Sequence, residues 1–152
     1  MTAALFYVDA IPATGPVTVS GEEARHAVSV MRLAAGEEVL AGDGRGTLAR
    51  CRVRVADRRA GLVLDAEELQ RVPAARQLNV VQAVPKGERG DIAVELLTEA
   101  GASRIVPWLS RRTVADWRGK QEPKRRRWQR VARAAAKQSR RAWEPEVGEL
   151  CT

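Results

Sequence analysis

The chain has 152 residues, of which 45% are hydrophobic, and this is enough for one ordinary domain or two small ones. No apolar run approaches the ~20 residues that cross a bilayer, and the first residues lack the basic and apolar regions of a secretion signal. Cys51 and Cys151 have no companion at metal-ligand spacing, which argues against a disulfide framework and a zinc site. We therefore expect a cytoplasmic protein without a membrane span or a metal.

The net charge of +7 is unevenly distributed. Residues 103–141 contain fourteen Lys or Arg against Asp116 and Glu122, a local balance of +12, which leaves −5 for the rest of the chain. This separation of charge favours a polyanionic partner, and nucleic acid is the first candidate. The alternative is a highly charged, solvated face.

Residues 4–69 contain several short strand candidates. Within residues 47–55, Ala49, Cys51, Val53 and Val55 alternate with Leu48 and three arginines, the pattern of a half-buried antiparallel strand. No helix follows the glycine-rich residues 42–46, so a hairpin turn is favoured there over a dinucleotide site. We predict a small β-barrel over residues 1–72.

One predicted helix interrupts these strands. Ser20 and Glu23 form a capping-box pattern at its start. The spacing of the apolar positions predicts a core-facing stripe made of Ala24, Ala27, Val28 and Met31. His26 is the single histidine of the chain, and nothing at useful spacing suggests a triad or a metal site, so we expect a structural or RNA-contacting role for it.

Residues 73–152 alternate strand and helix after a polar, proline-containing hinge at residues 70–77. Residues 78–84 form an apolar run typical of a buried parallel strand, and residues 103–110 form a second strand. The helix between them is predicted to end at Gly101 and to turn Ala93, Leu96, Leu97 and Ala100 toward the core. This pattern predicts an open α/β domain, with loops 85–90 and 110–114 at the edge where ligands usually bind.

A basic helix is predicted from Pro123 onward. Trp128, Val131, Ala132 and Ala135 take the positions of a buried stripe. Six cations fall on the opposite side of the helical wheel: Arg126, Arg130, Arg133, Lys137, Arg140 and Arg141. Residues 123–141 contain no acid, so an external anion is favoured, with neutralisation by acids elsewhere in the fold as the alternative. Six bound phosphates would give a log–log salt slope of about −4 to −5.

Residues 26–46, 82–114 and 127–147 together resemble the RsmE family along essentially the whole chain. Members of this family are SPOUT-class methyltransferases that modify N3 of a uridine in bacterial small-subunit ribosomal RNA. The resemblance implies a PUA-like RNA-binding barrel in residues 1–72 and the N-terminal part of a SPOUT methyltransferase domain in residues 73–152. It also implies S-adenosylmethionine as cofactor, no metal, the small ribosomal subunit as partner and a homodimer.

The family's cofactor pocket uses a Gly-Pro-Glu-Gly-Gly type loop and a Leu-Gly…Leu-Arg segment in the C-terminal knot, and neither occurs in this sequence. We therefore expect that this chain does not bind S-adenosylmethionine and is inactive alone. The alternative is a non-catalytic RNA-binding module.

The resemblance also assigns RNA-contacting roles. The barrel would use Arg25, His26, Arg32 and Arg45. Lys86 and Arg89, in a loop that lacks the G-x-x-x-x-G-K-[ST] pattern of a nucleotide site, would contact RNA or else pair with Glu88, Asp91 or Glu95. Arg111, Arg112 and Arg141 are candidates for a cationic or backbone-binding role, and no general base can be named. The family often has Glu and Gly where this chain has Lys137 and Arg140, and both changes add positive charge.

Overall fold

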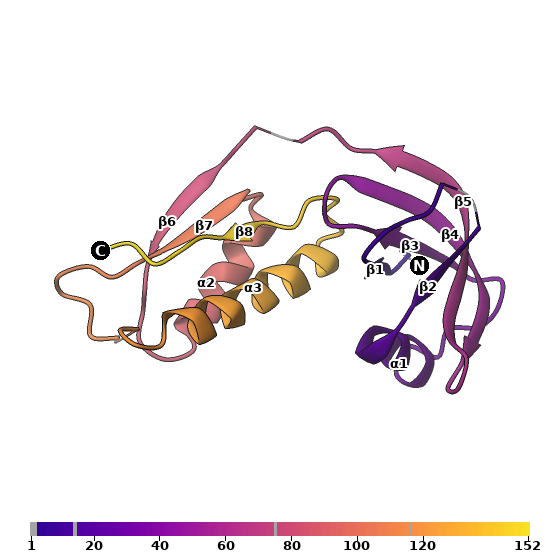
Figure 1. Ribbon diagram of the computed structural model, residues 1–152, viewed down its shortest axis with the longest axis horizontal. Helices are drawn as coiled ribbons and strands as arrows, with labels where there is room; N and C mark the ends of the chain where they lie inside the picture. Colours follow the sequence, from indigo (N-terminus) through magenta and orange to yellow (C-terminus); the bar gives the residue numbers. More distant parts are fainter. Residues whose placement is uncertain (1–2, 14, 75, 116) are drawn as a thin grey trace. The chain divides into compact units, whose positions relative to one another are not determined.

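The computed structural model describes residues 3–13, 15–74, 76–115 and 117–152. The chain divides into two compact units, Met1–Pro73 and Ala74–Thr152, here called the N-terminal and C-terminal units (Figure 1). No helix in the described ranges is long and apolar enough to cross a membrane.

The N-terminal unit is a five-stranded sheet with one helix. The strand order is β1-β3-β4-β5-β2, parallel between β1 and β3 and antiparallel elsewhere. Long strands β4 and β5 form the central hairpin (Figure 1). The elements are β1 (Leu5–Tyr7), β2 (Pro16–Val19), α1 (Gly21–Ser29), β3 (Glu38–Gly42), β4 (Thr47–Asp57) and β5 (Gly61–Arg71).

The predicted alternation of β4 is confirmed. Ala49, Cys51 and Val53 are buried, and the arginines between them are exposed. The buried side packs against β2, β5 and the Ala24–Ala27 face of α1 to form one apolar core. Burial of this kind raises the pKa of the Cys51 thiol to about 11, so Cys51 is a core residue.

The β3–β4 connection is a hairpin turn, as predicted. An oxygen of the Asp43 carboxylate accepts hydrogen bonds from the backbone N–H groups of Arg45 at 2.7 Å and Thr47 at 2.9 Å. Gly44 and Gly46 have φ of 66° and 98°, a left-handed backbone that favours glycine. The carboxylate and the glycines together fix the turn.

Two details predicted for α1 are wrong. Ser20 precedes the helix but makes no side-chain cap hydrogen bond. Met31 lies beyond the end of α1 with 39% of its side chain exposed, because the helix ends where the N–H groups of Val30 and Met31 both donate to the carbonyl of His26. Ala24 and Ala27 are buried, as predicted.

The C-terminal unit is a three-stranded parallel sheet of order β6-β7-β8 with two helices that pack against each other (Figure 1). Its core joins residues from α2, α3, β7 and β8, including Val94, Trp128, Ile105 and Val147. The elements are β6 (Asn79–Ala83), α2 (Arg89–Glu99), β7 (Arg104–Trp108), α3 (Gln121–Gln138) and β8 (Glu146–Val147). The predicted alternation of strand and helix is confirmed.

The predicted burial of the run 78–84 is confirmed for Val84, and Val80 packs against the core, but the prediction is wrong for Val81. Strand β6 lies at the edge of the described sheet, and Val81 is 60% exposed. An edge strand has a neighbour on one side only, so its apolar residues are less covered than those of the central strand β7, where Ile105 is fully buried.

The predicted core face of α2 is wrong in part: Leu97 packs against the core, but Leu96 and Ala100 do not. Its buried residues are Gly90, Val94 and Thr98, whereas Leu96 is 59% exposed; Ala100 is also exposed. The helix turns its small residues toward α3: a Cβ on Gly90 would lie 3.0 Å from the Trp128 ring. Thr98 is buried because its hydroxyl donates to the carbonyl of Val94 at 2.7 Å.

Helix α3 begins at Gln121, two residues before the predicted start. Trp128, Ala132 and Ala135 are buried, as predicted, together with Ala136. The helix ends at Gln138, so its last predicted cations, Arg140 and Arg141, lie beyond it, and Arg140 has a left-handed φ of 53°.

Candidate nucleic-acid interface

A pocket of about 350 Å³ lies at the carboxyl end of β6, where the chain turns into α2. Its wall is the loop from Val84 to Asp91, and the first turns of α3 close the opposite side. The lining consists of Val84, Pro85, Lys86, Gly87, Glu88, Gly90, Asp91, Ala115, Trp117, Lys124, Arg127 and Trp128.

The floor of this pocket is a pair of tryptophans. The rings of Trp117 and Trp128 meet edge to face, with centroids 4.9 Å apart and an interplanar angle of 73°. Only 4% of Trp117 and 3% of Trp128 is exposed. The rings therefore stabilise the pocket by packing on each other and present little surface on which a base could stack.

The rim of the pocket carries unpartnered positive charge. Arg127 donates to the Asp91 carboxylate at 2.9 and 2.6 Å, and this hydrogen bond raises the pKa of Arg127. Lys86 and Lys124 have no hydrogen-bond or ion-pair partner for their side chains in the described ranges. With Glu88 as the remaining acid of the lining, the two free lysines make the pocket suitable for an anion.

The predicted unpaired stripe on the basic helix is wrong for four of its six members, Arg126, Arg133, Lys137 and Arg141. Arg126 donates to Glu122 at 2.8 Å and Arg133 donates to Glu144 at 2.7 Å. Arg141 donates to the carbonyls of Thr98 and Ala102, both at 2.8 Å, at the end of α2. The two acids, Glu122 and Glu144, lie just before Pro123 and just after Arg141. They are therefore outside residues 123–141, which contain no acid.

Glu122 shows how strongly these pairs are coupled. Hydrogen bonds from Arg125 and then Arg126 lower the pKa of its carboxyl to about 2. Arg125 and Arg126 are therefore both engaged by Glu122 and are not free cations.

The other predicted contact residues are spread over several segments. Arg130 is exposed on α3, and Arg140 is exposed beyond its end; neither side chain has a partner in the part of the chain that is described. Lys137 is half-buried and has an interaction within the protein. The remaining predicted contact residues outside the pocket are also exposed. They are Arg25 and His26 on α1, Arg32 after α1, Arg45 in the β3–β4 turn, Arg89 at the start of α2, and Arg111 and Arg112 after β7.

The pocket brings together one predicted contact residue, Lys86, with two that the sequence analysis did not select, Lys124 and Arg127. Arg89 and the pair Arg111–Arg112 do not line it. The signal that could have identified Lys124 and Arg127 is the basic run directly before Trp128. Because Trp128 is buried in the floor of the pocket, residues that precede it on α3 lie beside the same pocket.

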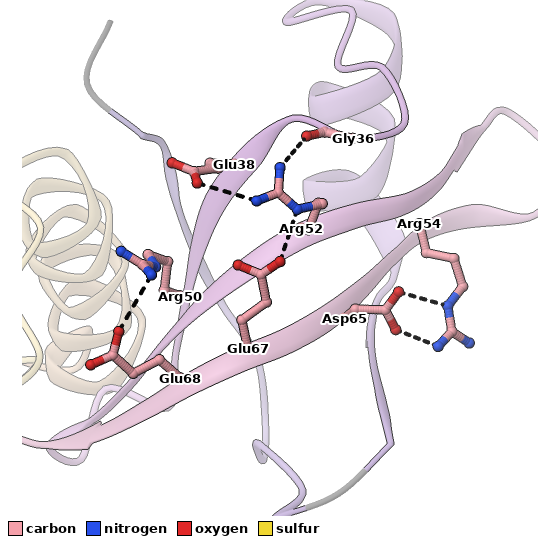
Figure 2. Close-up of polar contacts among 8 residues, drawn as sticks. All are labelled: Gly36, Glu38, Arg50, Arg52, Arg54, Asp65, Glu67 and Glu68. Atoms are coloured by element: carbon pink, nitrogen blue, oxygen red, sulfur yellow. Dashed lines mark hydrogen bonds and ion pairs between the residues drawn. The ribbon is translucent and has the colours of Figure 1, made fainter.

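The outer face of β4 holds a second group of arginines, all of which are paired (Figure 2). Arg50 lies 3.6 Å from Glu68, and Arg52 donates to Glu67 at 2.8 Å and to Glu38 at 3.4 Å. Arg54 forms a two-bond pair with the Asp65 carboxylate. These carboxylates raise the pKa of Arg52 and Arg54 and leave no free charge for a partner.

Two family models match the chain. Residues 72–152 match the RNA methyltransferase domain, and residues 19–64 match the RNA methyltransferase PUA domain. The chain belongs to the RsmE family of RNA methyltransferases. This confirms the resemblance found in the sequence and the predicted fold class.

Curated relatives carry the name ribosomal RNA small subunit methyltransferase E. The protein from Mycobacterium bovis is 49% identical over 158 residues, which cover 100% of this chain and 59% of that protein. The protein from Bacillus subtilis is 30% identical over 137 residues, which cover 88% of this chain and 53% of the relative. The chain therefore spans little more than half the length of these relatives.

Solved structures share the fold. An RsmE from Neisseria gonorrhoeae bound to S-adenosyl methionine has a TM-score of 0.85 at 21% identity, covering 98% of this chain and 62% of that one. A protein from Legionella pneumophila in complex with the bound cofactor SAM also has a TM-score of 0.85, at 19% identity, covering 100% and 64%. The PUA-like unit and the SPOUT-type α/β unit are thus both confirmed as folds.

The rim of the pocket at the β6–α2 loop, with Lys86 and Lys124, is suited to an anionic group. Within the described residues there is also no group of three His, Cys, Asp or Glu side chains that could hold a metal ion. The chemistry of this pocket favours phosphate.

Proposed function

We propose that this chain is the RNA-binding portion of a cytoplasmic, S-adenosylmethionine-dependent enzyme that methylates N3 of a uridine in small-subunit ribosomal RNA. Residues 1–72 would be the RNA-binding domain, and residues 73–152 the first part of the methyltransferase domain. The observation that carries the proposal is the 49% identity to a ribosomal RNA small subunit methyltransferase over the entire chain.

The residues present here would bind and present the RNA. Lys86 and Lys124 would each contact a phosphate at the edge of the sheet, since their ammonium groups have no partner among the residues that the structure describes. Arg130 and Arg140, and the exposed pair Arg111–Arg112, would add backbone contacts. The N3 edge of uridine is hidden in a paired helix, so the target has to be presented unstacked and unpaired.

Calorimetry with S-adenosylmethionine tests the enzyme assignment. We expect no heat of binding with the 152-residue chain. A form lengthened at the C-terminus to the size of its relatives is expected to dimerise, bind the cofactor and convert a uridine of small-subunit RNA to N3-methyluridine, detected by mass spectrometry of the nucleosides. Binding of the cofactor by the 152-residue chain would contradict the proposal that these residues bind RNA but not the cofactor.

The second candidate is a non-catalytic RNA-binding module that acts by occupying its site. It is favoured by the lysine-rimmed pocket, which suits the phosphate groups of RNA. The same calorimetry separates the two functions: a lengthened form that binds RNA, but neither binds the cofactor nor methylates RNA, would establish the module.

A further inference from the structure

A second cleft, of about 680 Å³, lies within the N-terminal unit. It is bordered by the end of β2, the exposed side of α1 and the turn that joins β4 to β5. Its lining comprises residues 18–21, 24, 25, 28, 29 and 57–61. A volume of this size accommodates a ligand of one or two nucleotides.

Three arginines surround this cleft, and each is exposed. Arg25 projects from α1, while Arg58 and Arg59 occupy the tip of the β4–β5 hairpin. Their side chains have no hydrogen-bond or ion-pair partner among the residues that the structure describes. This distinguishes them from the arginines a few residues earlier on β4, which are all paired with carboxylates (Figure 2).

The acid in the lining, Asp57, forms no ion pair with these arginines within the described residues. An oxygen of the Asp57 carboxylate accepts the backbone N–H groups of Arg59 at 2.7 Å and Ala60 at 2.9 Å. The carboxylate is therefore engaged in holding the turn, and the guanidinium groups beside it stay available. Glu22 and Glu23, the acids of the first turn of α1, are not part of the lining.

The cleft also borders the N-terminus of α1. Ser20 and Gly21 are in its wall, and the Ser20 side chain does not cap the helix. The positive end of a helix dipole beside three free guanidinium groups favours an anion. Bidentate guanidinium geometry matches phosphate oxygens well.

We infer that this cleft binds the phosphate backbone of RNA, without reading its sequence. None of the described residues that line it is aromatic, so they offer no surface for base stacking. Contacts to phosphate position a nucleic acid and carry no base information. RNA is favoured over an acidic protein because residues 19–64, which include all three arginines, match the PUA domain of RNA methyltransferases. The inference rests on the proposed function, in which RNA is the partner.

The test compares two double variants with the same loss of charge. Arg58→Gln with Arg59→Gln removes two cations from the cleft, and Arg50→Gln with Arg54→Gln removes two that are paired. Affinity for a short, mixed-sequence, fluorescein-labelled single-stranded RNA is measured by anisotropy between about 0.05 and 0.2 M KCl. The cleft variant should bind about tenfold more weakly and have a log–log salt slope shallower by about 1.4. The paired-arginine variant should bind like the wild type.

A third variant, Arg25→Gln, tests the cleft from a different element and should reduce the slope by about 0.7. If wild-type protein binds the RNA and the cleft variants bind equally well, the cleft inference is overturned while the proposed function stands. Equal weakening in the paired-arginine control would overturn it in favour of a general charge effect. Displacement of the RNA by polyaspartate at equal charge concentration would overturn it in favour of an acidic protein partner. Wild-type protein that does not bind RNA would overturn the proposed function and this inference together.

Discussion

The outer face of β4 and the surface of α3 are both rich in arginine, but they neutralise their charge by different routes. On β4, the antiparallel register places Asp65 opposite Arg52 and Glu68 opposite Arg50, so acids of β5 lie beside each arginine. On α3, the acids that pair with arginines are Glu122 in the first turn, Asp91 on α2 and Glu144 after the helix. Pairing on the strand is thus regular, and pairing on the helix is partial.

The difference teaches that a count of cations is not a count of free charges. The most basic segment of the sequence pairs several of its arginines, whereas some cations without a partner in the described residues lie in loops: Lys86 beside the pocket, and Arg58 and Arg59 at a hairpin tip. Loops are also where binding residues concentrate on a rigid scaffold. The variants below separate the two kinds of cation.

The largest expected effect is a loss of folding stability when a hydrogen-bonded arginine is removed. Arg141→Ala removes the guanidinium that donates to the carbonyls of Thr98 and Ala102. Because these half-buried bonds join the end of α3 to the end of α2, we expect the free energy of unfolding to fall by about 2 kcal/mol. Urea denaturation measures the change. The neighbouring control, Arg140→Ala, should leave stability nearly unchanged, and an equal loss in both variants would contradict the role of Arg141.

The next effect concerns the free cations of the pocket. Lys86→Gln with Lys124→Gln should weaken binding of single-stranded RNA about tenfold at 0.15 M salt, because two phosphate contacts are lost. The free energy of unfolding should be unchanged, since neither side chain has a partner within the described structure. Anisotropy titration and urea denaturation of the same samples provide the two readouts. A loss of stability without a loss of affinity would assign these lysines to the fold.

A smaller effect is expected on β4. Arg54→Gln breaks an exposed pair with Asp65, and exposed pairs contribute less than about 1 kcal/mol. The variant should therefore unfold at nearly the wild-type urea concentration and bind RNA with wild-type affinity. Clearly weakened RNA binding would show that this pair opens to a partner, and the contrast between the two kinds of arginine would fail.

The smallest effect is a pH dependence at the start of α3. The pKa of Glu122 is lowered to about 2 in the folded chain, so its pairs with Arg125 and Arg126 stabilise the fold above the ordinary Glu pKa of 4.5. This stabilisation is lost as pH falls from about 4.5 toward 2. Wild type should be more stable than Glu122→Gln near pH 6 and should converge with it near pH 2, measured by urea denaturation. A constant difference over this interval would argue against the low pKa.

Local patterns in the sequence predicted much of the fold. The two-residue alternation at Ala49, Cys51 and Val53 specified the inward face of β4, and the spacing of Trp128, Ala132 and Ala135 specified that of α3. The face of α2 was mispredicted because contact with Trp128 requires a small residue at Gly90, and close packing outweighed the larger side chain of Leu96. Such a contact joins distant parts of the chain and leaves no periodic signal.

The candidate sites were less predictable for the same reason. Lys86 was selected from its loop, but its neighbour Lys124 comes from another element, and only the folded chain places both on one pocket. The ion pair of Arg133 with Glu144 likewise depends on the return of the chain after α3. Free and paired cations look alike in a sequence, because pairing is a property of three-dimensional proximity.

The salt dependence of RNA binding by the wild-type chain tests the central claim most directly. Phosphate contacts by the five cations of the pocket and the cleft that have no partner within the described residues, Lys86, Lys124, Arg25, Arg58 and Arg59, would contribute about −3.5 to the log–log slope. Because Arg111, Arg112, Arg130 and Arg140 would add contacts, the account predicts a slope at least this steep for any single-stranded RNA sequence. A slope near zero, or an affinity that does not respond to salt, would contradict it.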